Sequence, residues 1–154
     1  MLFRSSSSTT FTLSGNELIN NNGYGIDVQN TGSGHLLENN LVKGNGTGGT
    51  DQTAGIGLRQ LAGGSNITVR SNTITGSVGD GIIVDSAWSA ITLTQNSVFG
   101  NGDLGIDLSA VSSNTGDGVT INDAGDGDSG GNDLLNFPVL NSATVAGANV
   151  NFLM

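Results

Sequence analysis

The strongest chemical signal in this chain is an acidic, glycine-rich stretch at residues 122–133. It holds Asp123, Asp126, Asp128 and Asn132, whose carboxylate and amide oxygens are of the type that Ca²⁺ prefers. The bidentate Glu that ends a twelve-residue calcium loop is missing, because Phe137 stands at that position. We predict a Ca²⁺ site that rigidifies the C-terminal segment. The alternative is an acidic surface loop whose glycines serve the backbone turn.

Other aspartates could form the pair of carboxyl groups that cleaves a glycosidic bond. Asp80, Asp85 and Asp103 lie close to one another in the repeats described below, and they are the weak catalytic candidates. Asp27 and Asp107 occupy equivalent positions, but three strand spacings, about 14 Å, should separate them. That separation exceeds the usual distance between two catalytic carboxyl groups. A solvated corner is the more common role of an aspartate in a turn.

Basic and nucleophilic side chains give weaker evidence for a catalytic site than the aspartates do. Arg59 and Arg70 each follow an apolar residue and should point outward, where a lyase would need a base, but neither has an evident acidic partner. His35, the single histidine, aligns with inward apolar positions and should be a neutral core residue. One such histidine cannot build a Ser-His-Asp or histidine–metal site. The absence of cysteine excludes disulfides, thiolate nucleophiles and cysteine-based zinc sites.

Two aromatic residues could contact a carbohydrate, because sugars bind beside aromatic rings flanked by amides and carboxylates. Trp88 lies in the bend between the third and fourth repeats, and Tyr24 ends the first repeat. Large aromatic side chains are more often buried, so packing against a loop is the alternative for both.

Length and charge limit the classes of function. The chain has 154 residues, enough for one ordinary domain, and a formal net charge of −9 with only four Lys and Arg residues. A nucleic-acid or anionic-lipid partner needs a basic surface that these residues cannot supply, so we expect neither. No apolar stretch is long enough to span a membrane, and the first fifteen residues do not read as a signal peptide. A fragment of a longer exported protein would look the same.

Four internal repeats organise the chain. They begin at Phe11, His35, Ile67 and Ile91, and a shared asparagine recurs at Asn16, Asn40, Asn72 and Asn96, in steps of 24, 32 and 24 residues. The longer step contains a polar insertion, residues 46–53, which should form a loop.

Within each repeat, apolar residues alternate with polar ones over three to five residues, which predicts short strands separated by Asn and Gly corners. A unit of about 24 residues cannot close a core alone, so the copies must stack as coils of a solenoid. The shared asparagines should form a hydrogen-bonded ladder between coils, a structural role.

The strings NITVRSNTITG (66–76) and AITLTQNSVFGNGDLGIDL (90–108) resemble the repeats of right-handed parallel β-helix proteins, the pectate-lyase-like superfamily. The resemblance covers residues 11–108. Residues 116–145 resemble the segment that closes such helices in large bacterial secreted or surface proteins. The family contains polysaccharide lyases, glycoside hydrolases, adhesins and coils without known activity, so the resemblance is specific for fold and poor for function.

These observations predict an all-β fold: a right-handed parallel β-helix, or solenoid, of about four to five coils with a C-terminal cap. We assign residues 1–10 to a lead-in, 11–115 to the coils, and 116–154 to the acidic loop and a capping segment in which residues 136–140 form an apolar plug.

The predicted function is that of a non-catalytic structural or adhesive module of an exported bacterial surface protein that contacts polysaccharide or a cell-surface glycan. The extracellular or cell-surface location, and further domains of a longer parent chain, are implied by the resemblance alone. The alternative is a carbohydrate-active enzyme of the polysaccharide lyase or glycoside hydrolase type. Three carboxylates clustered in a groove would favour the enzyme, and a smooth side would favour the structural role.

Overall fold

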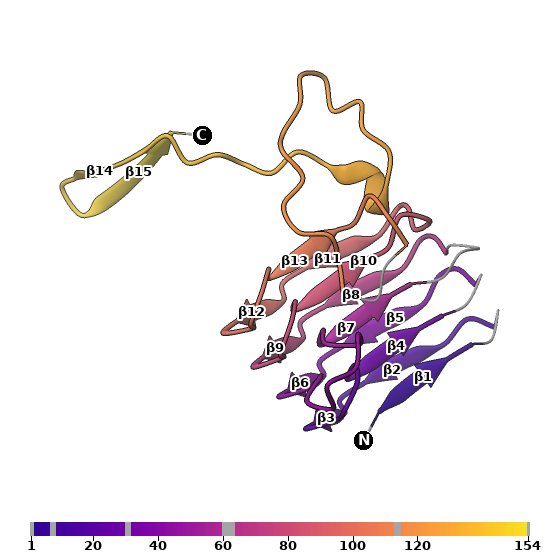
Figure 1. The fold of residues 1–154 in the computed structure, drawn as a ribbon. Coiled ribbons are helices and arrows are strands. Elements are labelled where there is room, and N and C mark those ends of the chain that lie inside the picture. Colours follow the sequence, from indigo (N-terminus) through magenta and orange to yellow (C-terminus); the bar gives the residue numbers. More distant parts are fainter. Residues whose placement is uncertain (1, 7–8, 30–31, 60–63, 113–114, 154) are drawn as a thin grey trace.

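A computed structural model describes residues 2–6, 9–29, 32–59, 64–112 and 115–153. The chain forms a parallel β-solenoid of about four turns, in which three sheets run along the stack (Figure 1). Sheet A contains β1 (Phe3–Ser5), β4 (Ile26–Val28), β7 (Ile56–Leu58), β10 (Ile82–Val84) and β13 (Ile106–Leu108). Sheet B contains β2 (Thr12–Ser14), β5 (Leu36–Glu38), β8 (Thr68–Arg70) and β11 (Thr92–Thr94). Sheet C contains β3 (Glu17–Ile19), β6 (Leu41–Lys43), β9 (Thr73–Thr75) and β12 (Ser97–Phe99). The predicted all-β solenoid is therefore confirmed.

The strand register follows the predicted repeat. Leu13, Leu37, Val69 and Leu93 are register partners in sheet B, so each coil adds one strand to each sheet. Every one of these strands has three residues. In sheets B and C a residue with positive φ, such as Asn39 (φ 55°), follows each strand and turns the chain at a corner. The middle residue points inward in sheets B and C. In sheet A, the two outer residues point inward and the middle residue points outward.

One apolar core fills the interior of the stack. Its fully buried members come from all three sheets, as Leu37, Val42 and Ile82 illustrate. His35 belongs to the same inward column, with its ring stacked on Phe11 at 4.3 Å between centroids. Burial lowers the pKa of His35, which agrees with the predicted neutral core histidine.

The predicted asparagine ladder runs along the corner between sheets B and C. The backbone N–H of each ladder asparagine donates to the side-chain oxygen of the next: Asn16 to Asn40 at 2.9 Å, Asn40 to Asn72 at 2.9 Å, and Asn72 to Asn96 at 3.0 Å. The Nδ2 of Asn72 also reaches back to the carbonyl of Leu37 at 2.9 Å. Each amide thereby supplies the hydrogen bonds that the corner removes from the strands.

A second ladder follows the corner after sheet C. Asn21 N–H donates to Asn45 Oδ1 at 3.0 Å, and Ser77 N–H donates to Asn101 Oδ1 at 3.0 Å. This ladder is not evident from the sequence, because the third coil carries Ser77 where the other coils have asparagine.

Both ends of the chain differ from a simple stack of repeats. Residues 3–5, within the predicted lead-in, form β1 at the edge of sheet A, where Arg4 is the register partner of Asp27. After β13, the chain makes a long loop and a short 3₁₀ helix, η1 (Gly131–Leu134), above the last coil (Figure 1). A hairpin of β14 (Ser142–Ala146) and β15 (Asn149–Leu153) lies away from the solenoid. In the described part of the chain, no helix has the length and apolar character to cross a membrane.

The η1 segment is attached to the last coil by hydrogen bonds. Gly131 N–H donates to the carbonyl of Ser109 at 2.8 Å, and Asn132 Oδ1 accepts from Ile91 N–H at 2.8 Å. Leu134 is buried beside them. The handedness of the solenoid and the closing role of residues 116–154 stay predictions.

Candidate functional site

The outer face of sheet A gathers most of the buried charge in the molecule. Its outward column, one residue per coil, reads Arg4, Asp27, Gly57, Ile83 and Asp107 in register. Three register steps separate Asp27 from Asp107, as the repeats predicted. The residues that precede each sheet A strand fold over this face, and Tyr24, Ala54 and Ile83 form a second buried apolar cluster there. The carboxylates above and below that cluster are therefore removed from water.

Asp27 lies at the N-terminal side of this face and is fully buried. It accepts from Arg4 Nε at 2.8 Å and from Arg59 Nε at 2.9 Å. The guanidinium carbon of Arg59 also lies 4.8 Å from the centre of the Tyr24 ring. The expectation that Arg59 has no acidic partner is therefore wrong, because stacking brings Asp27 beside it from 32 residues away.

Arg70 has a partner as well. Its Nη2 lies 2.7 Å from Glu38 Oε2 on the neighbouring strand of sheet B, so the sequence expectation fails here for the same reason. Both side chains are at the surface of the sheet. Neither arginine is left as a free base of the kind that a lyase requires.

A carboxylate cluster occupies the C-terminal side of the sheet A face. Asp80, Asp103 and Asp107 line one pocket of about 330 Å³, together with residues of the segment that follows the last coil. Two of the three predicted catalytic candidates, Asp80 and Asp103, are thus brought together. Asp107 joins them, although the sequence analysis compared it only with Asp27.

Asp80 and Asp107 approach each other closely. Asp80 Oδ2 and the carboxyl carbon of Asp107 each lie 3.0 Å from the point where a Cβ on Gly116 would stand, so these two atoms are no more than about 6 Å apart. Both side chains are buried, with 2% and 1% of their residue surface exposed, whereas Asp103 is exposed at the pocket. A glycine at 116 is required because any side chain would collide with this pair.

Each of the two buried carboxyl groups has one oxygen bound and one without a partner. Asp80 Oδ1 accepts from the Leu104 N–H at 2.9 Å, and Asp107 Oδ2 accepts from the Gly118 N–H at 2.9 Å. Asp80 Oδ2 and Asp107 Oδ1 have no hydrogen-bond partner among the described residues and are shielded from solvent.

This arrangement shifts the acidity of both groups. Burial, assisted by the nearby Asp107 carboxylate and opposed by the Leu104 N–H, raises the pKa of Asp80 to about 6. Burial also raises the pKa of Asp107, assisted by the negative charges of Asp117 and Asp103 and opposed by the Gly118 N–H. Two desolvated groups of like charge therefore hold a proton at a higher pH than an ordinary aspartate does, and Asp80 is protonated below about pH 6.

The third catalytic candidate lies apart from this cluster. Asp85 follows β10, and its Oδ1 and Oδ2 accept from the Ser86 N–H at 2.7 Å and from the Ser112 hydroxyl at 2.9 Å. It does not line the carboxylate pocket. Asp85 has the structural role of fastening a turn.

The two predicted carbohydrate-contacting aromatics are fully buried, with 0% of Trp88 and of Tyr24 exposed. Trp88 belongs to the main core, and Tyr24 covers Gly57 on the sheet A face. Stacking on a sugar requires an accessible ring face, so neither side chain offers such a contact here. The alternating pattern of the strands did not show that the connecting residues cover this sheet.

The predicted calcium ligands are divided between two places. Asp123 and Asp126 lie on the exposed loop, where Asn136 donates its N–H to Asp126 Oδ1 at 2.8 Å and accepts from the Asp123 N–H at 3.0 Å. Asn132 is instead bonded to Ile91. Within the described ranges, no group of three or more His, Cys, Asp or Glu residues gathers in a geometry that could hold a metal ion. Ca²⁺ binding stays a prediction.

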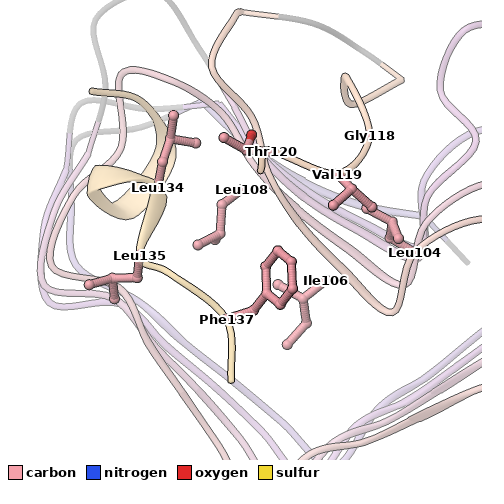
Figure 2. Close-up of a pocket in the computed structure, with 9 residues that line it drawn as sticks. All are labelled: Leu104, Ile106, Leu108, Gly118, Val119, Thr120, Leu134, Leu135 and Phe137. Atoms are coloured by element: carbon pink, nitrogen blue, oxygen red, sulfur yellow. The ribbon is translucent and has the colours of Figure 1, made fainter. Parts of the chain in front are cut away.

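An apolar pocket of about 420 Å³ opens beside the carboxylate pocket. Figure 2 shows Ile106 and Leu108 of the last coil facing Leu134, Leu135 and Phe137 of the C-terminal segment. Leu104, Gly118 and Val119 line both pockets. Ile106 is 44% exposed and Phe137 is 47% exposed, so the C-terminal segment covers this end of the core only in part.

Comparison of the chain with protein-family models, with curated proteins and with solved structures finds no match. The likeness to pectate-lyase-like proteins therefore depends on the repeats and on residues 116–145 of the sequence alone.

Proposed function

We propose that this chain is a non-catalytic structural and adhesive β-solenoid module of an exported bacterial surface protein, of the pectate-lyase-like type, and that it contacts polysaccharide. The observation that carries the proposal is the enclosure of the chemically distinctive side chains. The aromatic rings are buried, Asp27 is bound by two arginines, and the unpartnered oxygens of Asp80 and Asp107 are shielded from solvent.

Because the side chains of the sheet A face are enclosed, the outer faces of sheets B and C are the flat surfaces available to a polysaccharide. Thr92 and Thr94 present exposed hydroxyl groups on β11 of sheet B, and Thr68 of β8 is the register partner of Thr92. The hydroxyls of Thr68 and Thr92, one strand spacing of about 4.8 Å apart, can donate to and accept from the hydroxyls of an extended glycan. A surface of this kind supports many weak contacts and no chemical step.

The test combines binding and product release on the same polysaccharide panel. We expect retention on one or more bacterial or plant polysaccharides, with no new reducing ends and no unsaturated uronate products. Thr92→Glu should weaken retention if sheet B is the contact face, and Thr75→Glu on sheet C is the matched control. Failure to bind any polysaccharide would contradict the adhesive role.

A second candidate is a carbohydrate-active enzyme, and the Asp80–Asp107 pair is the observation that favours it. Two carboxyl groups within about 6 Å, one with its pKa raised to about 6, resemble in spacing the acid and nucleophile of a retaining glycosidase. Substrate would have to displace residues 115–119 to reach them. Product release that disappears in both Asp80→Asn and Asp107→Asn would establish this candidate in place of the first.

We also propose that Ca²⁺ binds the acidic loop and stabilises the C-terminal segment. Asp123 and Asp126 supply the carboxylates, and their shared contact with Asn136 supports the proposal. Millimolar Ca²⁺ should raise the Tm, EDTA should reverse the rise, and Asp126→Ala with Asp128→Ala should abolish it. A Tm that does not change when Ca²⁺ is added would contradict the proposed calcium site.

A further inference from the structure

The segment of residues 115–119, here called the strap, lies against the buried carboxyl pair. Its Gly118 N–H donates to Asp107 Oδ2 at 2.9 Å, and its Gly116 packs where a Cβ would collide with Asp107 and lie 3.0 Å from Asp80 Oδ2. Asp117 on the same segment accepts from the Ala110 N–H at 3.0 Å. The strap thus connects the last coil to the C-terminal segment through direct contact with two acids.

Among the described residues, no Lys, Arg or His forms an ion pair with either of these carboxyl groups. The sequence contains four Lys and Arg residues and one His in total. Arg4 and Arg59 bind Asp27, and Arg70 binds Glu38. Lys43 is on the exposed face of sheet C, and His35 is in the core column beside Phe11. Neutralisation of the pair must come from outside these side chains.

The other charged groups near the pair are negative. Asp103, from the connection between β12 and β13, and Asp117, from the strap, both act on the pair electrostatically, and Asp80 in turn acts on the buried Tyr24 hydroxyl below. A second ionisation within this group leaves two desolvated negative charges no more than about 6 Å apart, with two more nearby. One proton removes that repulsion and supplies a donor to an otherwise unpartnered oxygen.

We propose that Asp80 and Asp107 form a proton-operated latch: they hold the strap against the last coil while they share a proton, and they weaken that hold when both are ionised. The proposal is independent of whether the module binds polysaccharide. It gives Asp80 and Asp107 a role, pH-dependent control of the strap, that a purely structural scaffold does not need.

Release of the strap would change the surface of the C-terminal end. Gly118 and Val119 line both the carboxylate pocket and the apolar pocket, together with Leu104. When the strap moves away, Ile106 and Leu108 lose part of their cover. The latch therefore controls how much apolar surface this end exposes, with less exposure in acid and more at neutral pH.

The test is hydrogen exchange of the full chain followed at single amides from pH 5 to pH 7.5, with protection factors corrected for the intrinsic pH dependence of exchange. The pKa of Asp80, raised from 3.8 to about 6, predicts that protection of the Gly118 amide falls about tenfold over this range. The Thr73 amide, bonded to the Asn40 carbonyl at 2.9 Å in a distant corner, is the internal reference and should not change. Carboxyl-carbon chemical shifts should place the corresponding titration at Asp80 and Asp107.

Variants separate the latch from general effects of pH. Asp80→Asn removes one ionisation and keeps the shape of the side chain, so protection at Gly118 should become independent of pH. Asp103→Asn is the matched control, because it lines the same pocket but is exposed, and it should keep most of the pH dependence. Constant Gly118 protection in the unmodified chain overturns the proposal whether or not any variant folds. A fall that persists unchanged in a folded Asp80→Asn variant overturns it as well.

Discussion

Single side chains replace backbone hydrogen bonds at the corners of this molecule. Each strand has three residues, so a coil has many corners at which strand pairing stops. Asn72 shows how the corner is satisfied: its Nδ2 donates to the Leu37 and Arg70 carbonyls, at 2.9 and 3.0 Å, and its Oδ1 accepts from the Asn40 N–H. The stability of the stack therefore depends on a few buried amides.

Replacement of the central ladder residue should be costly. Asn72→Ala leaves the Asn40 N–H and the Leu37 carbonyl buried without these partners, and we expect it to lower the free energy of unfolding by about 3 kcal/mol. Asn16→Ala is the control, since Asn16 is exposed at the end of the ladder, and it should cost about 1 kcal/mol or less. Urea denaturation measures both. Equal losses would show that the ladder is not the source of stability.

The ion pairs of Arg59 and Arg70 should also differ in their contribution to stability. Arg59→Ala leaves the fully buried Asp27 with Arg4 as its remaining arginine partner, and we expect a loss of about 3 kcal/mol. Arg70→Ala breaks a surface pair with Glu38 and should cost about 0.5 kcal/mol. Chemical denaturation of the two variants measures both losses. A larger loss of stability in Arg70→Ala than in Arg59→Ala would contradict this prediction.

These side-chain partners mark where prediction from sequence stops. The ladder at Asn16, Asn40, Asn72 and Asn96 was predictable because all four coils keep the residue. The pairing of Arg59 with Asp27 was not, because the insertion shifts the contact to 32 residues and no local pattern contains it. The Asp80–Asp107 pair was missed for a related reason: Asp80 precedes its strand and Asp107 is inside one, so no shared repeat position joins them.

At the scale of elements, the spacing between coils depends on glycines, because the backbone of the next coil approaches too closely for a side chain at these positions. A Cβ on Gly81 would stand 2.5 Å from the Gly105 carbonyl oxygen, and it would also meet Val98 and Asn101. Two successive sheet A strands therefore meet at glycines just before they begin. Gly81 and Gly105 each precede the isoleucine that begins the strand, and at Gly81 the close approach of the next coil excludes a side chain.

Substitution of Gly81 tests that account. Gly81→Ala should force β10 and β13 apart and lower stability by about 2 kcal/mol. Gly127→Ala is the control, because its Cβ would have only Asp123 Oδ2 at 3.7 Å nearby. Thermal melts should show a lower Tm for the first variant alone. A stable Gly81→Ala chain would mean that the coils can separate at little cost.

At the scale of the whole molecule, two buried titratable groups set opposite pH dependences. The pKa of Asp80 is raised, so its contribution to stability is complete below pH 3.8 and is lost as the pH rises through about 6. The pKa of His35 is lowered, so its contribution is present above its ordinary value of 6.5 and is lost as the pH falls. The two contributions oppose each other between about pH 4 and 6.5, so each masks part of the other in the unmodified chain.

Substitution of His35 or of the buried acids should make the pH dependence caused by the remaining group visible. In His35→Phe, which keeps a ring beside Phe11, the free energy of unfolding should fall by about 2–3 kcal/mol as the pH rises from 4 to 7. In Asp80→Asn combined with Asp107→Asn, which removes both buried acids of raised pKa, it should instead fall as the pH is lowered below 6.5. Denaturation at stepped pH gives both profiles. Parallel profiles in the two variants would contradict the assignment of these groups.

The asparagine ladder also has a direction. Every ladder residue donates toward the following coil, so Asn96 at the C-terminal end keeps a backbone N–H without a partner among the described residues, ready for the amide oxygen of another coil. A gene that duplicates a 24-residue unit would therefore add a coil whose contacts already exist in the template below it. The solenoid can then lengthen by whole coils, with the same contacts between coils and the same surface pattern.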